Sequence, residues 1–354
     1  MAGQDIIVVG ASAGGVETLS TLVADLPEDL PASVFIVLHV APHTGSALPR
    51  ILSRHTELPV DHPRDGEPIR HSRVYVAVPD HHLIVGQGIV RVTTGPKENG
   101  YRPAVDTLFR TAAAAYGPRV VGVILSGTRD DGTAGLRAIR ERGGTGIVQR
   151  PDEALFPGMP QSALSADHPD FVVSVVEIGA LLAKLARAGP PHEGGSAPLP
   201  DRLDAELQWA DAELGGRATS DPPLGSPSGF TCPECHGALW EIDDGGFPRY
   251  RCRVGHGFSA DSLLFTQRSD AEAALWAAYR ALEERAALCR RVADRAKLRH
   301  ADITGEHFRI EAAVVGRQAE MLRAVLSSRD RPPEHDATES ALDDEGRAVE
   351  GSSP

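Results

Sequence analysis

A serine lies in a glycine-rich turn directly after the first apolar run of the chain. The run Asp5-Ile6-Ile7-Val8-Val9 is followed by Gly10-Ala11-Ser12-Ala13-Gly14-Gly15 and then by a stretch with helical spacing. A strand, a sharp turn and a helix in this order would expose the hydroxyl of Ser12 as a nucleophile, with amides at the helix N-terminus to stabilise an oxyanion. Glycine-rich turns in this position also bind phosphate groups. From the turn alone both interpretations stay open, and a purely structural turn is the third.

A serine nucleophile needs a histidine to accept its proton and a carboxylate to orient that histidine. His39 directly follows the apolar run Val34-Phe35-Ile36-Val37-Leu38, and active sites of open α/β sheets collect at the carboxyl ends of strands. Asp130 and Asp131 follow the later run Val120 to Leu125 at the same topological position. One of these two aspartates could orient His39 and the other cap the next helix.

Three of the four cysteines lie close together and suggest a metal site. Cys232 and Cys235 form a Cys-x-x-Cys pair, and Cys252 and His256 form a Cys-x-x-x-His pair. Two such pairs match a closed tetrahedral zinc site that stabilises a fold without catalysing a reaction. Reduced thiols, or a redox pair of the first two cysteines, are the alternatives.

Two further residues bear on this predicted metal site. His236 is a competing nitrogen ligand, but it directly follows Cys235 and so has poor chelate geometry. Cys289, the fourth cysteine, lies on a helical apolar stripe, where we expect a core residue.

The elements that must position these groups alternate between apolar runs and helical patterns up to about residue 187. The expected strands are 6–9, 34–39, 74–78, 120–125, 146–149 and 171–176, and the expected helices are 15–25, 45–55, 103–116, 132–142 and 176–187. Residues 82–94 have the pattern of a hairpin. The fold class is therefore α/β: a doubly wound, mostly parallel sheet of Rossmann-like topology with helices on both faces.

Composition changes after residue 187 and predicts a second, different part of the chain. Residues 188–229 are rich in Gly, Pro and Ser and are expected to form a linker, with a short helix around Leu203 to Leu214. We expect a zinc-ribbon-like module at 230–265 and a helical hairpin or coiled coil at 266–328, broken near Ile303-Thr304-Gly305. The tail, 329–354, has the composition of a disordered segment.

Charge and length exclude several classes of function. The chain has 354 residues, 41% of them hydrophobic, and a formal net charge of -13. That charge disfavours nucleic acid as a partner, since phosphate binding relies on Lys and Arg. The N-terminus has no signal peptide, and no apolar run is long enough to insert into a membrane, so a cytoplasmic location is expected.

Four ordered segments of the N-terminal half resemble a known family. They are Val9 to Gly15, Val37 to Pro42, Arg102 to Phe109, and Gly122 to Gly127 together with Asp131-Gly132. This half, about residues 4–185, is similar to the catalytic domain of the CheB-type chemotaxis protein-glutamate methylesterases. The resemblance implies that Ser12 is the nucleophile, His39 the general base and Asp131 the residue that orients it, with no cofactor for catalysis.

By the same resemblance, the substrate would be a methylated chemoreceptor or another methylated signalling protein, with deamidation of glutamine as a second activity. Two departures from the family pattern are visible. Thr128, Arg129 and Asp130 stand where the family usually has Met, Gly and Asn. A phosphoacceptor receiver domain usually precedes the esterase, whereas this sequence begins at the catalytic strand, so we expect control by another route.

The leading hypothesis is thus a serine esterase joined to a zinc-ribbon-like and helical extension. That extension would bind a protein partner, self-associate through its helices, or control access to the site. The alternative is a signalling adaptor whose esterase domain is vestigial or redirected, and nucleotide binding at the loop from Gly10 to Gly15 is the third hypothesis.

Overall fold

The structure, a computed structural model, describes residues 3–40, 46–188, 225–244 and 246–328. The chain divides into two compact units, residues 1–266 and 267–354. The predicted linker helix around Leu203 to Leu214 and the predicted disordered tail lie outside the described residues. No helix in the described ranges is long and apolar enough to cross a membrane.

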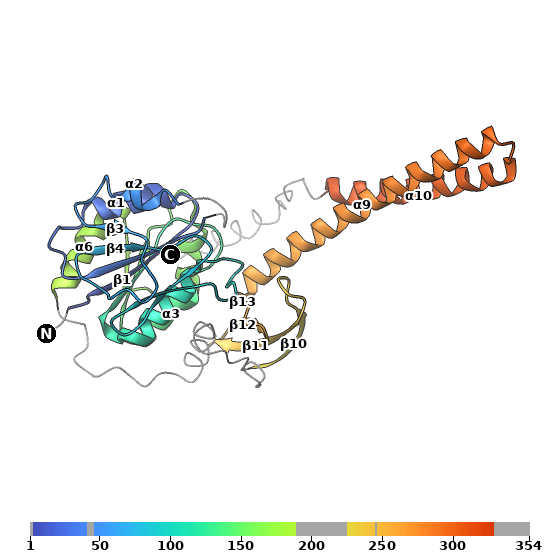
Figure 1. Ribbon diagram of the computed structural model, residues 1–354. Helices are drawn as coiled ribbons and strands as arrows, with labels where there is room; N and C mark the ends of the chain where they lie inside the picture. The colour runs from blue at the N-terminus through green and yellow to red at the C-terminus, as the bar shows by residue number, and fades with distance from the viewer. Residues whose placement is uncertain (1–2, 41–45, 189–224, 245, 329–354) are drawn as a thin grey trace, which may run out of the picture. The chain divides into compact units, whose positions relative to one another are not determined.

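A seven-stranded sheet forms the centre of the first unit, in the strand order β3-β4-β2-β1-β7-β8-β9 (Figure 1). All of its strand pairs are parallel, as the alternation of apolar runs and helical patterns predicts. The strands are β1 (Ile6–Ala11), β2 (Ser33–Leu38), β3 (Val60–Asp61), β4 (Arg73–Val76), β7 (Val120–Ile124), β8 (Thr145–Gln149) and β9 (Phe171–Val173).

Helices cover both faces of this sheet, and each face has its own hydrophobic cluster. One face packs against α1 (Gly15–Ala24), α2 (Leu48–Leu52) and α6 (Val175–Arg187). The other packs against α3 (Val105–Tyr116), α4 (Thr133–Glu141) and α5 (Gly158–Ala166), and against the hairpin of β5 (His82–Val85) and β6 (Val90–Thr93). The predicted strands, the hairpin and the doubly wound α/β class are confirmed.

The second sheet of the first unit is antiparallel and has the order β10-β11-β12-β13. Its strands are β10 (Ser226–Thr231), β11 (Ala238–Asp244), β12 (Phe247–Cys252) and β13 (Gly257–Ser259). We call residues 226–259 the cysteine module, because they carry Cys232, Cys235 and Cys252. The module begins inside the predicted linker: β10 is an edge strand that contains Pro227, and edge strands tolerate proline.

Two long helices follow the cysteine module. They are α9 (Ala260–Leu298) and α10 (Asp302–Ser328), and between them the chain turns back to form a hairpin. Within the second unit, Ala286, Cys289 and Ala293 of α9 are buried, as are Ala312 and Val315 of α10. The burial of Cys289 agrees with its predicted place in a core.

The break that was predicted near Ile303-Thr304-Gly305 lies slightly earlier in the chain, because all three residues are inside α10. The turn falls at residues 299–301, where His300 has a positive φ of 56°. A β-carbon at Gly305 would lie 3.4 Å from the carbonyl oxygen of Ala293. That distance is an ordinary van der Waals contact, so Gly305 packs against α9 beside the turn and does not end a helix.

Candidate active site

Ser12 lies between the end of β1 and the start of α1. Its amide donates a hydrogen bond to the carbonyl of Ser126, which follows β7, at 3.0 Å, and its own carbonyl accepts from the amide of Gly15 at 2.9 Å. The turn uses a left-handed conformation at Gly14, with φ of 71°, directly before the helix. A β-carbon at Gly127 would lie 2.9 Å from that of Ser12, so the turn fits against the loop after β7.

His39 follows β2 and lies beside the serine turn because of the sheet register. Ala11 pairs with Leu38, so Ser12 and His39 each come directly after a paired residue of neighbouring parallel strands. The amide of His39 also donates to the carbonyl of Ala11 at 3.2 Å. The backbone register therefore places Ser12 and His39 at the same carboxyl edge of the sheet, as the strand order predicts.

Asp131 completes the group from the loop between β7 and α4. Its Oδ2 lies 2.8 Å from Nε2 of His39, and the carboxylate is fully buried. The amide of Val105 donates to Oδ2 at 2.7 Å, and Asp106 N and Asn99 Nδ2 donate to Oδ1 at 3.2 Å and 2.9 Å. Two of these donors belong to the first turn of α3, where amides favour a negative charge.

The electrostatics of Asp131 suit a carboxylate that orients a histidine. Burial opposes ionisation of Asp131, but the hydrogen bond and charge of His39, with the donors at Val105 and Asn99, lower its pKa. With Nε2 on Asp131, the other ring nitrogen, Nδ1, is buried and has no hydrogen-bond partner among the described residues. Nδ1 is therefore the ring nitrogen that remains for the proton of a nucleophile.

Comparisons with known proteins match this part of the chain. The sequence profile of the family described as CheB methylesterase matches residues 7–182. A protein-glutamate methylesterase/protein-glutamine glutaminase of Anaeromyxobacter dehalogenans is 36% identical over 183 residues, which cover 52% of this chain and 54% of the relative. A Leptospira interrogans protein, provisionally named for the same two activities, is 35% identical over 51% of this chain and 94% of its own length.

A solved structure matches the same half. The catalytic domain of the Thermotoga maritima CheB methylesterase is 33% identical, with a TM-score of 0.50, over 52% of this chain and all of that domain. The chain belongs to the CheB methylesterase family. Its CheB domain, residues 7–182, spans about half the length of the Anaeromyxobacter relative.

Tyr101 and Asn99 adjoin the proposed triad of the CheB domain, and the sequence alone did not single them out. The ring of Tyr101 stacks on His39 with centroids 3.6 Å apart and planes 8° apart. Asn99 donates its amide to both Asp106 and Asp131 at 2.9 Å. Tyr101 directly precedes Arg102, where the family segment begins, and Asn99 lies three residues before it. Proximity to that segment is the sequence signal that could have pointed to both residues.

The residues that depart from the CheB pattern contact the start of α9. The guanidinium of Arg129 lies over the ring of Tyr101, 4.5 Å from its centroid, and over the ring of Phe265 at 4.3 Å. Asp130 accepts a hydrogen bond from the hydroxyl of Ser262 at 3.0 Å. In this chain, Arg129 and Asp130 thus connect the catalytic loop to residues that follow the cysteine module.

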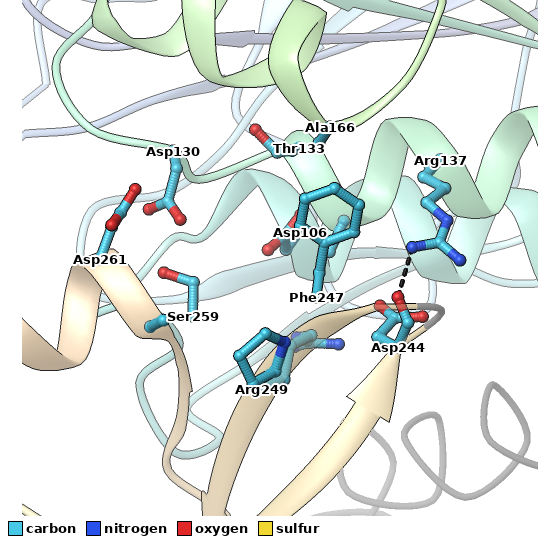
Figure 2. Close-up of a pocket in the computed structure, with 13 residues that line it drawn as sticks. Asp106, Asp130, Thr133, Arg137, Ala166, Asp244, Phe247, Arg249, Ser259 and Asp261 are labelled. Carbon is cyan, nitrogen blue, oxygen red and sulfur yellow. Dashed lines mark hydrogen bonds between the residues drawn. The ribbon is translucent and has the colours of Figure 1, made fainter.

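A pocket of about 180 Å³ lies where the cysteine module meets α4 (Figure 2). Asp130 and Asp261 line one end, and at the other Arg137 donates to the carbonyl of Asp244. Asp106 also lines the pocket. Burial, together with the charge of nearby Asp131, raises the pKa of Asp106 to about 7.

Arg102 lies four residues before Asp106, a spacing that would allow an ion pair within a helix, but its acidic partner is Asp80. Its guanidinium donates to Asp80 at 2.8 Å and to the carbonyl of Gly95 at 2.9 Å. Arg102 thus connects the start of the segment before α3 to Asp80 and to the residues that follow β6.

The four predicted metal ligands converge within the cysteine module. Ligand atoms of Cys232, Cys235, Cys252 and His256 all lie within 4.8 Å of one another. Cys235 Sγ is 3.6 Å from Cys252 Sγ, and the latter is 3.5 Å from Nδ1 of His256. Tetrahedral zinc with bonds of about 2.0–2.3 Å has ligand separations of about 3.3–3.8 Å, so the cluster fits such an ion. His236 is outside the cluster.

Proposed function

We propose that the CheB domain hydrolyses γ-methyl esters of glutamate on methylated chemoreceptors or related signalling proteins. Ser12 is the nucleophile, His39 the general base and Asp131 the carboxylate that orients it. The observation that supports this best is the state of His39: one ring nitrogen is held by Asp131, and the other is buried without a partner among the described residues, beside the serine turn.

The reaction proceeds by acyl transfer in two halves. Nδ1 of His39 takes the hydroxyl proton as Ser12 Oγ attacks the ester carbonyl carbon. The tetrahedral intermediate collapses with cleavage of the bond between that carbon and the methoxy oxygen, and His39 returns the proton to release methanol. Water, activated by the same nitrogen, then attacks the acyl-enzyme. The bond to Ser12 Oγ breaks, which releases the glutamate side chain of the substrate protein as a carboxylate and restores the Ser12 hydroxyl.

Asp131 holds the ring so that Nε2 carries its proton toward the carboxylate and Nδ1 keeps its lone pair for Ser12. It also stabilises the imidazolium that forms in each half-reaction. The amide of Ala13, which follows the nucleophile at the N-terminus of α1, is the proposed donor to the oxyanion. The same sequence of steps on a glutamine side chain releases ammonia, so deamidation is a second proposed activity.

Methanol release from methylated chemoreceptor tests this function. Purified full-length protein should release methanol, and Ser12→Ala should abolish the release, with Ser20→Ala as the matched control because the Ser20 hydroxyl donates to the carbonyl of Val16 within α1. Equal release by Ser12→Ala would contradict the proposal. Labelling of Ser12 by a fluorophosphonate probe is a second readout, and absence of both would favour the alternative of an adaptor with a vestigial esterase.

We also propose that Cys232, Cys235, Cys252 and His256 hold a structural zinc ion. Thiolate and imidazole ligands in a closed set of four suit zinc and leave no position for a substrate. The buried core of the module is small, so an ion would supply much of its stability. Elemental analysis should find one zinc per chain in wild-type protein and in His236→Asn, and less in Cys252→Ser. Equal zinc in all three would exclude this ligand set.

A further inference from the structure

The segment Lys97–Tyr101 contacts both the cysteine module and the proposed triad. Its backbone pairs with the residue that follows the ligand His256: the amide of Asn99 donates to the carbonyl of Gly257 at 2.8 Å, and the amide of Gly257 donates to the carbonyl of Lys97 at 3.3 Å. The side chain of Asn99 adds a third link, since its Oδ1 accepts from the amide of Ser259 at 2.9 Å.

Charge pairing fixes the same segment to the module. Glu98 is buried, and its carboxylate accepts from Arg249 at 2.5 Å and Arg251 at 2.9 Å, both on β12, and from Arg110 on α3. Burial opposes ionisation of Glu98, but these three guanidinium groups hold its pKa well below the usual range. A buried charge with such partners is costly to displace, so the segment is held at a defined position.

On its other side, the segment contacts two members of the triad. Asn99 donates to Oδ1 of Asp131, and Tyr101 stacks on the ring of His39. The amide group of Asn99 therefore has its oxygen on the module and its nitrogen on the catalytic carboxylate. A shift of Gly257 or Ser259 would be transmitted to Asp131 through one side chain.

We propose that Asn99 is a positioning residue through which the metal-loaded cysteine module holds Asp131 in its catalytic orientation. The inference rests on the proposed esterase function and on the proposed metal site. It assigns the module a role in activity: catalytic competence depends on an intact metal site that touches no substrate.

Glycine substitutions can disturb this contact without removing a metal ligand. A β-carbon at Gly257 would lie 2.9 Å from Oε1 of Glu98 and 3.1 Å from the guanidinium of Arg251, so Gly257→Ala must disturb the buried ion pair that fixes the segment to the module. Gly237→Ala is the matched control in the same module, since its β-carbon would meet Cys235 Sγ at an ordinary 3.6 Å. Both variants should keep the zinc content of wild type.

The experiment measures esterase kinetics and amide hydrogen exchange on the full chain. Gly257→Ala, and wild type treated with a zinc chelator, should show kcat lowered by about 10-fold with KM nearly unchanged, and faster exchange of the Val105 and Asp106 amides that bond Asp131. Gly237→Ala should match wild type in both. Unchanged exchange and unchanged kcat in Gly257→Ala would overturn the inference.

Asn99→Ala identifies the side chain that carries the effect. Its kcat should fall by about 10-fold, and the acid limb of its pH profile should move to higher pH, because loss of this donor raises the pKa of Asp131. Adding Gly257→Ala should lower kcat little further, since both changes break the same link. Fully multiplicative effects of the two substitutions on kcat would overturn the role of Asn99.

The two proposals can fail separately. If neither wild type nor any variant hydrolyses the ester, the proposed esterase function is wrong. If the variants still differ from wild type in hydrogen exchange, the contact between the module and Asp131 is nevertheless supported.

Discussion

In the parallel sheet, the proposed catalytic residues lie on loops beside a large core, whereas in the cysteine module two of the four proposed metal ligands belong to the core itself. Two extended clusters of buried apolar side chains fill the faces of the parallel sheet, and Ser12 belongs to neither. The module buries only a few side chains, and Cys232 and Cys252, both fully buried, are among them.

This difference predicts which substitutions abolish activity without unfolding the protein and which do not. A core that does not depend on the catalytic side chains should tolerate their replacement, so that activity is lost and the fold remains. A small core that contains metal ligands has no such separation, because two of the side chains proposed to bind the ion are also part of the buried cluster. Four predictions test or refine this contrast.

The largest expected effect is loss of catalysis from Asp131→Asn. An asparagine amide presents a donor where His39 and three N–H groups require an acceptor, so the ring takes the wrong tautomer. We expect kcat to fall by about 10³–10⁴-fold, as for the same change in serine proteases, with the secondary structure retained by circular dichroism. Asp130→Asn is the neighbouring control and should stay within about tenfold of wild type. Global unfolding of Asp131→Asn would show that the sheet depends on its catalytic groups after all.

The next effect is local unfolding of the cysteine module in Cys252→Ser. Loss of one ligand weakens the metal site, and the few remaining apolar contacts do not offset the conformational entropy of the four strands. Limited proteolysis should cut within residues 226–259 at protease concentrations that leave wild type intact, while the parallel sheet keeps its hydrogen-exchange protection. Cys289→Ser, outside the module, should not create these cuts. A module that stays protected in Cys252→Ser would contradict the contrast.

A smaller effect concerns the pH dependence of stability and involves Asp106. Its pKa is about 7 in the folded chain, against an ordinary value of 3.8, so folding favours the protonated form. The stability that this proton provides is present below about pH 4 and is lost as pH rises through about 7. Asp106→Asn should therefore flatten the decline in free energy of unfolding over that window, measured by urea denaturation. Asp61→Asn, whose carboxylate is 63% exposed, should leave the slope of wild type, and equal slopes in all three proteins would contradict the assignment.

The sequence predicted the parallel sheet well because its strands are buried apolar runs that end in recognisable loops. The same rule located Ser12, His39 and the pair of Asp130 and Asp131, since each follows a strand of one sheet, and the family resemblance then chose Asp131. Helix α5 was missed, because Gly158 and Pro160 in its first turn conceal a helical pattern.

The contacts of the segment Lys97–Tyr101 could not be predicted from the sequence, for a different reason. Asn99 and its partner Ser259 are 160 residues apart in the chain, and Glu98 binds arginines at similar separations. No local pattern encodes such pairs. Contacts over a similar separation involve the two residues that depart from the family pattern. Arg129 stacks on Phe265, and Asp130 accepts a hydrogen bond from Ser262.

The smallest expected effect concerns the free energy of unfolding of two Arg129 variants, which distinguish backbone strain from stacking at this residue. This residue has a positive φ of 66°, which costs a non-glycine residue about 1 kcal/mol, while its guanidinium stacks on Tyr101 and Phe265. Arg129→Gly removes both terms, so its free energy of unfolding should stay within about 1 kcal/mol of wild type. Arg129→Ala keeps the strain and loses the stacking, so it should be less stable than Arg129→Gly by about 1 kcal/mol. Urea denaturation measures both, and equal stability of the two variants would contradict the prediction, because the entropy that glycine adds to the unfolded chain would then offset the relief of strain. If Arg129→Gly were much less stable than wild type, the stacking of Arg129 on Tyr101 and Phe265 would contribute more to stability than the positive φ costs.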